Sequence, residues 1–211
     1  MTVRTGFPMV VAAPSGTGKT TVCRRVVEQD GGIVFSVSHT TRPRRPGEVD
    51  GSDYHFVDDA TFERLVAEWA FLEWAVYNGR HYGTSLASID APLREGLDVL
   101  LEIEVQGARQ VRARRPDARF VFLLPPSFAT LRERLIGRGT DEPEAIERRL
   151  EVAAGELLAV HDFDYAVTND ALEDCVRDVL AILAAERRGE TAAVRRRFAP
   201  SRAARALTET G

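Results

Sequence analysis

Residues 13–20 read APSGTGKT, a pattern typical of a loop that binds phosphate groups. The P-loop pattern is G-x-x-x-x-G-K-S/T, and this chain has Ala13 in the place of the first glycine. An apolar stretch precedes the loop and a stretch with helical periodicity follows it, as the motif requires. In this setting the backbone N–H groups of residues 15–20 point into one concavity, and the positive end of the following helix reinforces it. The expected chemistry is the binding of a polyphosphate.

Lys19 is the single lysine among the 28 lysine and arginine residues of the chain. A phosphate within a ring of amide groups needs a compact charge on a flexible stem, and a planar guanidinium group would not fit the same loop. We expect Lys19 to contact the nucleotide phosphates and the Thr20 hydroxyl to bind Mg²⁺. P-loops serve GTPases, ATPases and nucleotide kinases alike, so the loop alone leaves the reaction open. The residues predicted to bind the nucleotide are Ala13, Pro14, Ser15, Gly16, Thr17, Gly18, Lys19, Thr20 and Thr21.

The elements that must position this loop alternate along the chain. Short apolar runs, rich in β-branched or aromatic residues, predict strands at 9–13, 34–38, 99–103, 120–124 and 165–168. Apolar residues three and four positions apart predict helices at 19–29, 108–114, 131–136, 144–160 and 172–185. Strands that are buried on both faces and alternate with helices predict an α/β fold with a parallel sheet.

Residues 39–95 interrupt this alternation. The segments DYHFV, FLEWAVY and RHYGTS alternate between apolar and polar residues as short antiparallel strands do, and Asn78-Gly79 is a strong hairpin signal. We therefore expect a small mixed lobe inserted into an α/β core, which comprises residues 7–38 and 96–187.

The composition excludes several classes of protein. With 211 residues, 44% of them hydrophobic, the chain can bury the core of one domain without disulfide or metal support. No run approaches the length of a membrane span, and the N-terminal segment does not resemble a signal sequence. Cys23 and Cys175 form no redox or zinc motif, so we expect two buried thiols in a cytoplasmic protein. The four histidines form no metal-ligand set.

Charge is distributed unevenly along the chain. The net charge of −4 argues against a nucleic-acid-binding protein, whereas local clusters of arginine suit small anionic ligands. Residues 188–211 lose the apolar period and are rich in Gly, Pro, Ala and Arg. We expect them to form a flexible Arg-rich tail, and a functional basic arm is the alternative.

Four further segments, which occur with the P-loop in a fixed order, resemble those of guanylate kinases. They read SVSHTTRPRRPGEVDGSDYHFV at 36–57, FLEWAVYNGRHYGTS at 71–85, LEIEVQGARQVR at 101–112 and RLIGRGTDEPEAIERRL at 134–150. The resemblance covers residues 7–187. It implies a P-loop nucleoside-monophosphate kinase fold, with helices on both faces of a parallel sheet, a GMP-binding lobe at 39–95 and a lid at 137–149.

The resemblance implies a site for GMP in and next to the inserted lobe. Guanine presents two adjacent donors, N1–H and the N2 amino group, which one carboxylate can accept together, and its O6 can accept from a hydroxyl group. Glu73 and Glu104 match the guanine-binding acids of the family, with Ser38 and Thr84 as hydroxyl partners. The residues that match its clamp for the GMP phosphate are Arg42, Arg45, Tyr54 and Tyr82.

The segment at 134–150 resembles the lid that closes over the donor triphosphate in this family. Gly137 and Gly139 would supply the hinge freedom, and arginines carried by the lid would neutralise the migrating phosphoryl group once water is excluded. The catalytic residues that the resemblance implies are Lys19, Arg42, Arg134, Arg138 and Arg149, of which Arg134 and Arg138 also bind ATP.

Three further roles follow from the resemblance. Asn169 matches a contact to the adenine of ATP, and Glu102 is placed to bind or orient Mg²⁺ together with Thr20. Glutamate stands at 102 and at 104 where the family usually has aspartate. No general base is required, because the acceptor phosphate has a second pKa of about 6 and is already deprotonated near neutrality.

We therefore expect a Mg²⁺-dependent guanylate kinase that transfers the γ-phosphoryl group of ATP to GMP, giving ADP and GDP, in purine nucleotide metabolism. ATP and GMP are the predicted partners, and neither nucleic acid nor a membrane is expected. One alternative is a catalytically inactive guanylate-kinase-like binding module, which would typically lack a working P-loop. The other is a different P-loop small-molecule kinase, such as a ribose bisphosphokinase, which would not keep Glu73 and Ser38.

Overall fold

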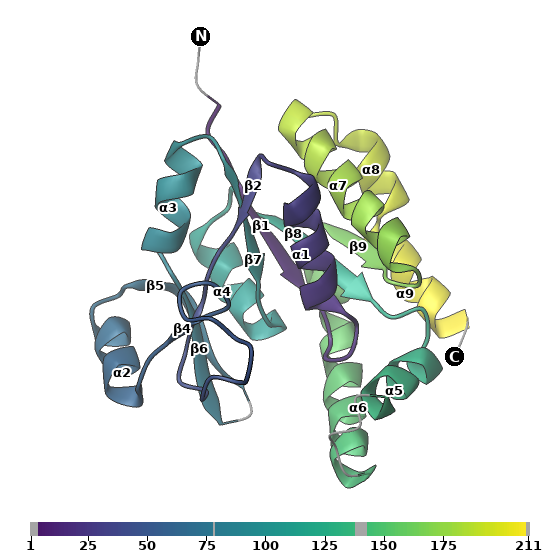
Figure 1. The fold of residues 1–211 in the computed structure, drawn as a ribbon. Helices are drawn as coiled ribbons and strands as arrows, with labels where there is room; N and C mark the ends of the chain where they lie inside the picture. Colours follow the sequence, from purple (N-terminus) through teal and green to yellow (C-terminus); the bar gives the residue numbers. More distant parts are fainter. Residues whose placement is uncertain (1–3, 78, 138–142, 210–211) are drawn as a thin grey trace. The chain divides into compact units, whose positions relative to one another are not determined.

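The structure is a computed structural model that describes residues 4–77, 79–137 and 143–209. The chain divides into two compact units. One comprises residues 1–10 and 31–118, and the other comprises residues 11–30 and 119–211. Strand β1 (Pro8–Ala12), which Figure 1 labels, begins in the first unit and ends in the second.

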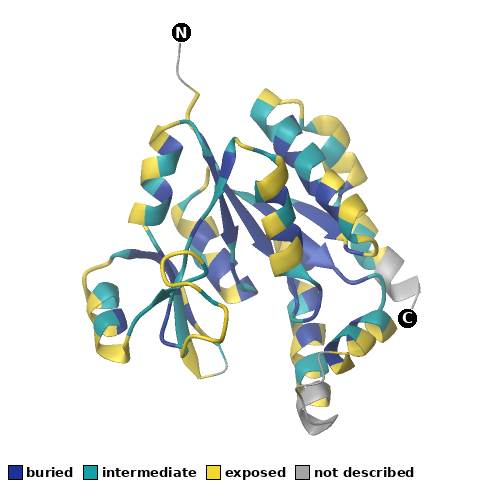
Figure 2. Ribbon diagram, in the orientation of Figure 1, coloured by how far each residue is buried: buried dark blue, intermediate teal, exposed yellow. Residues whose placement is uncertain are grey.

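A parallel sheet forms the core, with the strand order β2-β7-β1-β8-β9. In the first unit, β2 (Ile33–Phe35) pairs in parallel with β7 (Asp98–Glu102). In the second unit, β8 (Arg119–Leu124) pairs in parallel with β9 (Tyr165–Thr168). Every residue of β1 is buried, as are most of β7 and β8, because parallel strands are covered on both faces (Figure 2). The predicted parallel sheet is confirmed, with strand bounds that differ by a few residues.

Before its C-terminal segment, the second unit contains the helices α1 (Lys19–Gln29), α5 (Phe128–Ile136), α6 (Pro143–Leu157) and α7 (Leu172–Arg188), with a 3-10 helix at Leu158–Asp162. Helices α1 and α7 lie side by side (Figure 1). An ion pair joins Arg25 of α1 to Glu173 of α7 at 3.1 Å, and a second joins Arg187 of α7 to Asp30, the C-cap of α1, at 2.6 Å. Helix α5 begins earlier than its apolar pattern predicts, because the Ser127 side chain caps it by accepting from the Thr130 N–H.

The inserted segment of the first unit forms a second sheet, with the order β4-β3-β6-β5. The predicted hairpin is present: β5 (Phe71–Tyr77) and β6 (Arg80–Ser85) are antiparallel, and Gly79 has a φ of 70°. Its other turn residue, Asn78, lies outside the described residues. Strand β3 (His39–Thr40) is antiparallel to β6 and parallel to β4 (His55–Phe56), so the sheet is mixed.

Three helices of the first unit accompany these strands. Helix α4 (Val105–Arg114) was predicted from its apolar spacing, and it begins three residues before the predicted start at 108. Helices α2 (Asp59–Ala67) and α3 (Ala87–Arg94) were not predicted. Helix α2 follows an Asp58 cap that accepts from the Thr61 N–H at 2.7 Å, a local signal that the alternating pattern on either side obscured.

The C-terminal segment differs from the flexible tail that the sequence predicts. It contains α8 (Ala192–Arg197) and α9 (Pro200–Glu209), and Phe198 between them is only 6% exposed. The Phe198 carbonyl accepts from the Ala166 N–H of β9 at 2.8 Å, so the segment packs on the last strand of the sheet order. The expectation of a loose tail is wrong for these residues. Phe198 and one strand edge anchor the segment, and α9 is amphipathic, a pattern that the abundance of Ala and Arg obscured in the sequence.

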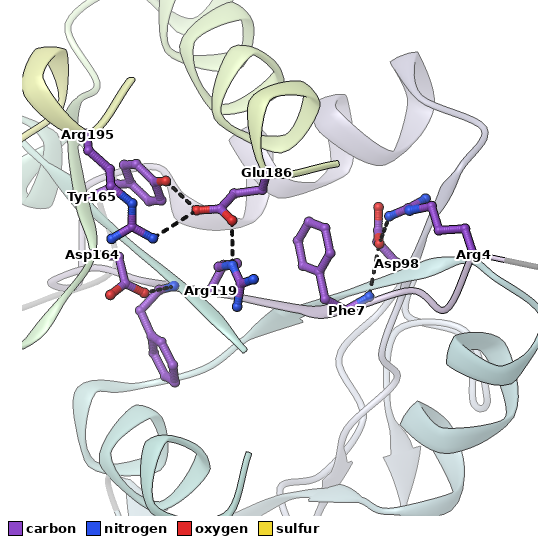
Figure 3. A network of polar contacts seen from close by, with 9 residues as sticks. Arg4, Phe7, Asp98, Arg119, Asp164, Tyr165, Glu186 and Arg195 are labelled. Atoms are coloured by element: carbon purple, nitrogen blue, oxygen red, sulfur yellow. Dashed lines mark hydrogen bonds and ion pairs between the residues drawn. The ribbon is translucent and has the colours of Figure 1, made fainter. Parts of the chain in front are cut away.

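The buried side chain of Glu186, on α7, also contacts this C-terminal segment (Figure 3). Its side chain is 3% exposed and accepts from Arg119 Nε at 2.5 Å, from the Tyr165 hydroxyl and from Arg195 Nη2 of α8 at 3.3 Å. A buried carboxylate is stable only when several donors satisfy it, so Arg195 helps to satisfy a charge that belongs to the core of the unit.

No helix among residues 4–77, 79–137 and 143–209 is long and apolar enough to cross a membrane.

Candidate active site

The P-loop has the backbone that its glycines permit. Gly16 and Gly18 have φ values of 91° and 88°, in the left-handed region that other residues rarely adopt. The Thr17 N–H donates to the Pro14 carbonyl at 3.2 Å, which tightens the turn. Helix α1 begins at Lys19 directly after Gly18, and the N-cap residue provides no side-chain cap. The loop and the first turn of the helix therefore present backbone N–H groups next to Lys19 and Thr20, as an anion site does.

Two side chains from distant segments meet this loop. Asn169, at the end of β9, donates from Nδ2 to the Thr17 carbonyl at 2.7 Å. Arg149 of α6 donates from Nη2 to the Ser15 hydroxyl at 2.7 Å. The hydroxyl of Thr17 is itself buried and makes no hydrogen bond to any described residue.

The predicted lid arginines have different positions. Arg149 reaches the P-loop, as above. Arg134 of α5 donates from its two terminal nitrogens to the carbonyls of Asn169, at 3.0 Å, and Asp170, at 3.3 Å. Arg138 lies outside the described residues. Two of the three predicted arginines therefore contact the P-loop or the segment that contacts it.

Three of the four predicted guanine-binding residues come together in the first unit. Glu73 and Thr84 are 4% and 0% exposed, on neighbouring strands β5 and β6, where they are register partners. The Thr84 hydroxyl donates to Glu73 Oε1 at 2.6 Å, and the Ser38 hydroxyl lies 3.3 Å from that of Thr84. A buried carboxylate with a hydroxyl partner can accept paired donors from a ligand, because each of its oxygens has two lone pairs.

Helix α4 holds the strand that carries Glu73, a feature that the sequence reasoning missed. Gln110 bonds to the backbone of Trp74, accepting from its N–H at 3.3 Å and donating to its carbonyl at 2.6 Å. Arg114 donates to the carbonyls of Phe71 and Leu72, at 3.0 and 2.7 Å. The backbone of β5 is therefore fixed on both sides of Glu73.

Gly107 faces the carboxylate of Glu73 from the same helix. A Cβ atom on Gly107 would lie 2.3 Å from Glu73 Oε2, so only glycine leaves room for the acid. Gly107, Gln110 and Arg114 are spaced three and four residues apart, and this shared helical face is the signal that could have identified them from the sequence.

Arg42, a predicted ligand of the acceptor phosphate, is paired with Glu48. Its two terminal nitrogens donate to the two carboxylate oxygens at 3.0 and 2.7 Å, and the Arg45 backbone N–H donates to the same carboxylate at 2.7 Å. The hydrogen bonds from Arg42 hold the pKa of Glu48 below its ordinary value, and Glu48 in turn raises the pKa of Arg42. Glu48 was not predicted as a site residue, although it lies in the same proline-rich segment.

The two predicted tyrosines lie beside this pair. The Arg42 guanidinium carbon is 5.4 Å from the ring centre of Tyr54, within the range of a cation–π contact. The rings of Tyr54 and Tyr82 meet edge to face, with their centres 6.0 Å apart. The side chain of Arg45 is exposed. Arg42, Tyr54 and Tyr82 therefore form one cluster on the inserted sheet.

The two glutamates predicted near the nucleotides lie at the end of β7. Glu102 is its last residue, and Glu104 is the N-cap of α4. In the ranges that the structure describes, no group of three or more His, Cys, Asp or Glu side chains could hold a metal ion.

Comparisons with known proteins identify guanylate kinases as relatives of this chain. A family model described as guanylate kinase matches residues 5–186. The guanylate kinase of Thermus thermophilus is 55% identical over 183 residues, covering 87% of this chain and 83% of the relative, and that of Alkalilimnicola ehrlichii is 52% identical over 182 residues, covering 86% and 90%. The crystal structure of guanylate kinase from Anaplasma phagocytophilum matches with a TM-score of 0.73 at 32% identity, covering 87% of each chain.

Proposed function

This chain belongs to the guanylate kinase family, and from that premise we propose how its residues divide the work of moving a phosphoryl group from ATP to GMP. The enzyme is an ATP:GMP phosphotransferase that yields ADP and GDP. The single observation that supports our assignment of roles best is the buried Glu73, which accepts from Thr84 and has Ser38 close to that hydroxyl.

The P-loop binds the phosphates of ATP in this proposal. Backbone N–H groups of the loop and the first turn of α1 surround the phosphates, and Lys19 supplies the positive charge. The left-handed glycines support this role, because a loop with that backbone can point its N–H groups into one concavity for an anionic ligand. The remaining ATP-binding residues are Ala13, Pro14, Ser15, Gly16, Thr17, Gly18, Thr20, Thr21, Arg134, Arg138 and Asn169.

Mg²⁺ fits the donors that this loop offers. A nucleotide-bound Mg²⁺ ion takes one or two protein oxygens and completes its shell with phosphate and water oxygens, so it needs no cage of three acidic residues. The Thr20 hydroxyl, in the first turn of α1, is such an oxygen, and Glu102 is the proposed acid for the same ion. When bound, the ion neutralises part of the charge on the phosphates.

Glu73 selects guanine. Its carboxylate accepts from the N1–H and N2 amino groups together, Ser38 and Thr84 supply hydroxyl groups, and Glu104 is the second acid. Adenine would place an acceptor against the buried carboxylate, which would leave two acceptors facing each other without a proton between them. Sites built on such hydrogen bonds reject the wrong base by a factor of about 10⁴ or more.

The phosphate of GMP binds to the cluster on the inserted sheet. Arg42 exchanges the two oxygens of Glu48 for two phosphate oxygens, since carboxylate and phosphate offer the same fork to a guanidinium group. Tyr54, Tyr82 and Arg45 complete the clamp. The acceptor oxygen is already deprotonated near neutrality, so these residues position it and no general base is needed.

Arginines of the second unit stabilise the charge on the transferred group. Arg149, which bonds to Ser15, and Arg134, which bonds to the Asn169 and Asp170 carbonyls, approach the donor phosphates, and Arg138 completes this set.

We place the reaction in the cytoplasm, because Cys23 and Cys175 are buried and form no disulfide bond, as in a reducing compartment.

A coupled assay of ADP release tests the proposal with GMP, AMP, UMP and CMP as acceptors, in wild type and in Glu73→Gln. Glutamine offers one oxygen and a competing amino group, so we expect kcat/KM for GMP to fall by about a hundredfold or more while KM for ATP changes less than about twofold. The exposed Glu63→Gln on α2 is the matched control. Equal losses for ATP and GMP would show that Glu73 does not read the base.

A further inference from the structure

Asn169 is one of few polar residues in the buried core, at 6% exposure, and its side chain ends on the P-loop. The residue directly follows β9, where the strand ends beside the end of β8. Burying a side-chain amide costs free energy unless hydrogen bonds replace those it made to water. The hydrogen-bond partners of Asn169 therefore indicate its role.

The backbone of Asn169 is fixed on two sides. Its N–H donates to the Leu124 carbonyl at 2.8 Å, which continues the pairing of β8 with β9 by one residue. Its carbonyl accepts from Arg134 Nη1 at 3.0 Å, and the same guanidinium group donates to the next carbonyl, that of Asp170. The side chain therefore projects from a rigid point of the second unit.

From this point the amide Nδ2 donates to the Thr17 carbonyl at 2.7 Å. The same nitrogen lies 2.8 Å from where a Cβ atom on Gly18 would be, so glycine at 18 is required by this contact as well as by its φ of 88°. The Thr17 carbonyl and the Gly18 N–H belong to one trans peptide group, in which they point in opposite directions. A bond that holds the carbonyl toward Asn169 consequently turns the N–H away from Asn169.

We infer that Asn169 is a positioning residue for the P-loop, which holds the Thr17–Gly18 peptide so that its N–H serves the phosphates of the donor nucleotide. This inference rests on the proposed role of the loop in binding ATP. Two glycines with left-handed φ make the loop costly to order, and a fixed hydrogen bond removes part of that cost before ATP binds. Asn169 then acts on the phosphates through the loop, whatever base the nucleotide carries.

Inorganic tripolyphosphate distinguishes this role from a contact to adenine, because it has three phosphate groups and no base. In Asn169→Ala and in Asn169→Leu we expect KM for ATP and the inhibition constant of tripolyphosphate against ATP to rise by the same factor, about tenfold, which corresponds to about 1.4 kcal/mol. KM for GMP should change less than about twofold. Asn169→Leu keeps a side chain of similar size and removes its N–H donors without adding a charge, so it tests the bond even if the alanine variant folds poorly.

Thr168→Ala, a truncation of the exposed neighbouring side chain, is the matched control and should leave both constants unchanged. A loss confined to ATP, with tripolyphosphate unaffected, would overturn the inference and leave Asn169 as a contact to adenine. Unchanged constants for both ligands would overturn it as well. Lys19→Ala tests the premise that the loop binds phosphate. If this change did not weaken the binding of tripolyphosphate, the proposed role of the loop would be wrong, and the inference about Asn169 would fail with it.

Discussion

Arg42 and Glu48 form a forked ion pair whose geometry is the one that a phosphate group would offer. The carboxylate receives three N–H groups, two from the Arg42 side chain and one from the Arg45 backbone. Glu48 therefore keeps the guanidinium group in one orientation, and under the proposed assignment it releases the group when GMP binds. The same pair contributes to folding stability in a manner that depends on pH.

Glu48→Gln should lower the melting temperature at neutral pH by about 2 °C. The bonds from Arg42 lower the pKa of the folded-state carboxyl below its ordinary value of 4.5, so their stabilisation is fully present above that value. It is lost as the pH falls through the lower folded-state pKa. Melting curves of both proteins from neutral pH to about pH 3 should therefore converge at the acid end.

Glu68→Gln is the control for this experiment. Glu68 pairs with Arg64 at 3.2 Å on the surface of α2, with both side chains more than half exposed, so its loss should change the melting temperature by less than about 1 °C. A difference between wild type and Glu48→Gln that persisted undiminished at low pH would contradict the assignment of this effect to the ionised carboxylate.

Helix α4 holds strand β5, which carries Glu73, in position through side-chain hydrogen bonds to the backbone of the strand. Gln110 and Arg114 bond to the backbone of β5, and Gly107 leaves the space that the carboxylate occupies. The helix thus determines the position of the proposed guanine-reading acid without contacting a ligand in our assignment.

Gly107→Ala should displace the Glu73 carboxylate, since the new Cβ would lie 2.3 Å from Oε2. We expect KM for GMP to rise about tenfold or more, with KM for ATP unchanged, in steady-state kinetics. Gly155→Ala on α6 is the same chemical change where a new Cβ would meet no atom within 4 Å beyond the nearby backbone of its own helix. It should leave kinetics unaltered and raise stability by about 0.5–1 kcal/mol. Similar kinetics in the two variants would mean that the carboxylate moves aside without cost.

The C-terminal helices α8 and α9 contribute to the stability of the second unit. Removal of residues 190–211 would expose the surface that Phe198 covers, free the Ala166 N–H and take Arg195 from Glu186. We expect the melting temperature to fall by about 5–10 °C, from about 1.5–3 kcal/mol of lost burial, while kcat at moderate temperature is retained. Phe198→Ala in the full chain should shift it in the same direction.

Two results of the truncation would contradict this account. An unchanged melting temperature would show that the packed segment contributes no stability, and a large loss of kcat in a folded, truncated protein would show that it supports the reaction.

In our proposal, each compact unit of the chain binds one nucleotide. The P-loop, Asn169, Arg134 and Arg149 belong to the second unit, whereas the cluster around Glu73 and the Arg42 pair belong to the first. The thiols of the chain are both in the second unit, on α1 and α7, and they report on its folding.

Cys23 and Cys175 are each 1% exposed, and burial, followed by the charge of Asp178, raises the pKa of Cys175 to about 12. A thiol with such a pKa stays protonated at mildly alkaline pH and is a poor nucleophile. We expect neither cysteine to react with dithiobis-nitrobenzoate over minutes in the folded protein, and both to react at once in concentrated guanidinium chloride. Rapid reaction of a thiol without denaturant would contradict the packing of α1 against α7.

Local patterns were sufficient for the order of strands and helices in the α/β core and for the P-loop. The spacing of apolar residues in 19–29 and 120–124 shows which face of the helix or strand is buried. Gly16 and Gly18 of the P-loop have left-handed φ values that other residues rarely adopt, so their positions in the sequence predict the turn. The short helices α2 and α3 escaped prediction because strand-like alternation surrounds them.

Contacts between distant residues were decided by the folded chain. Ser38 meets Thr84, and Asn169 meets Thr17, across 46 and 152 positions of sequence, through the registers and strand ends that place them. Family resemblance pointed to several of these residues, but not to Glu48, Gln110 or Gly107, nor to the docking of Phe198. The physical reason is that a hydrogen bond, or the burial of a side chain, depends on which residues face it in the folded chain. The periodicity of apolar residues shows only which face of a helix or strand is buried, not which residues bury it.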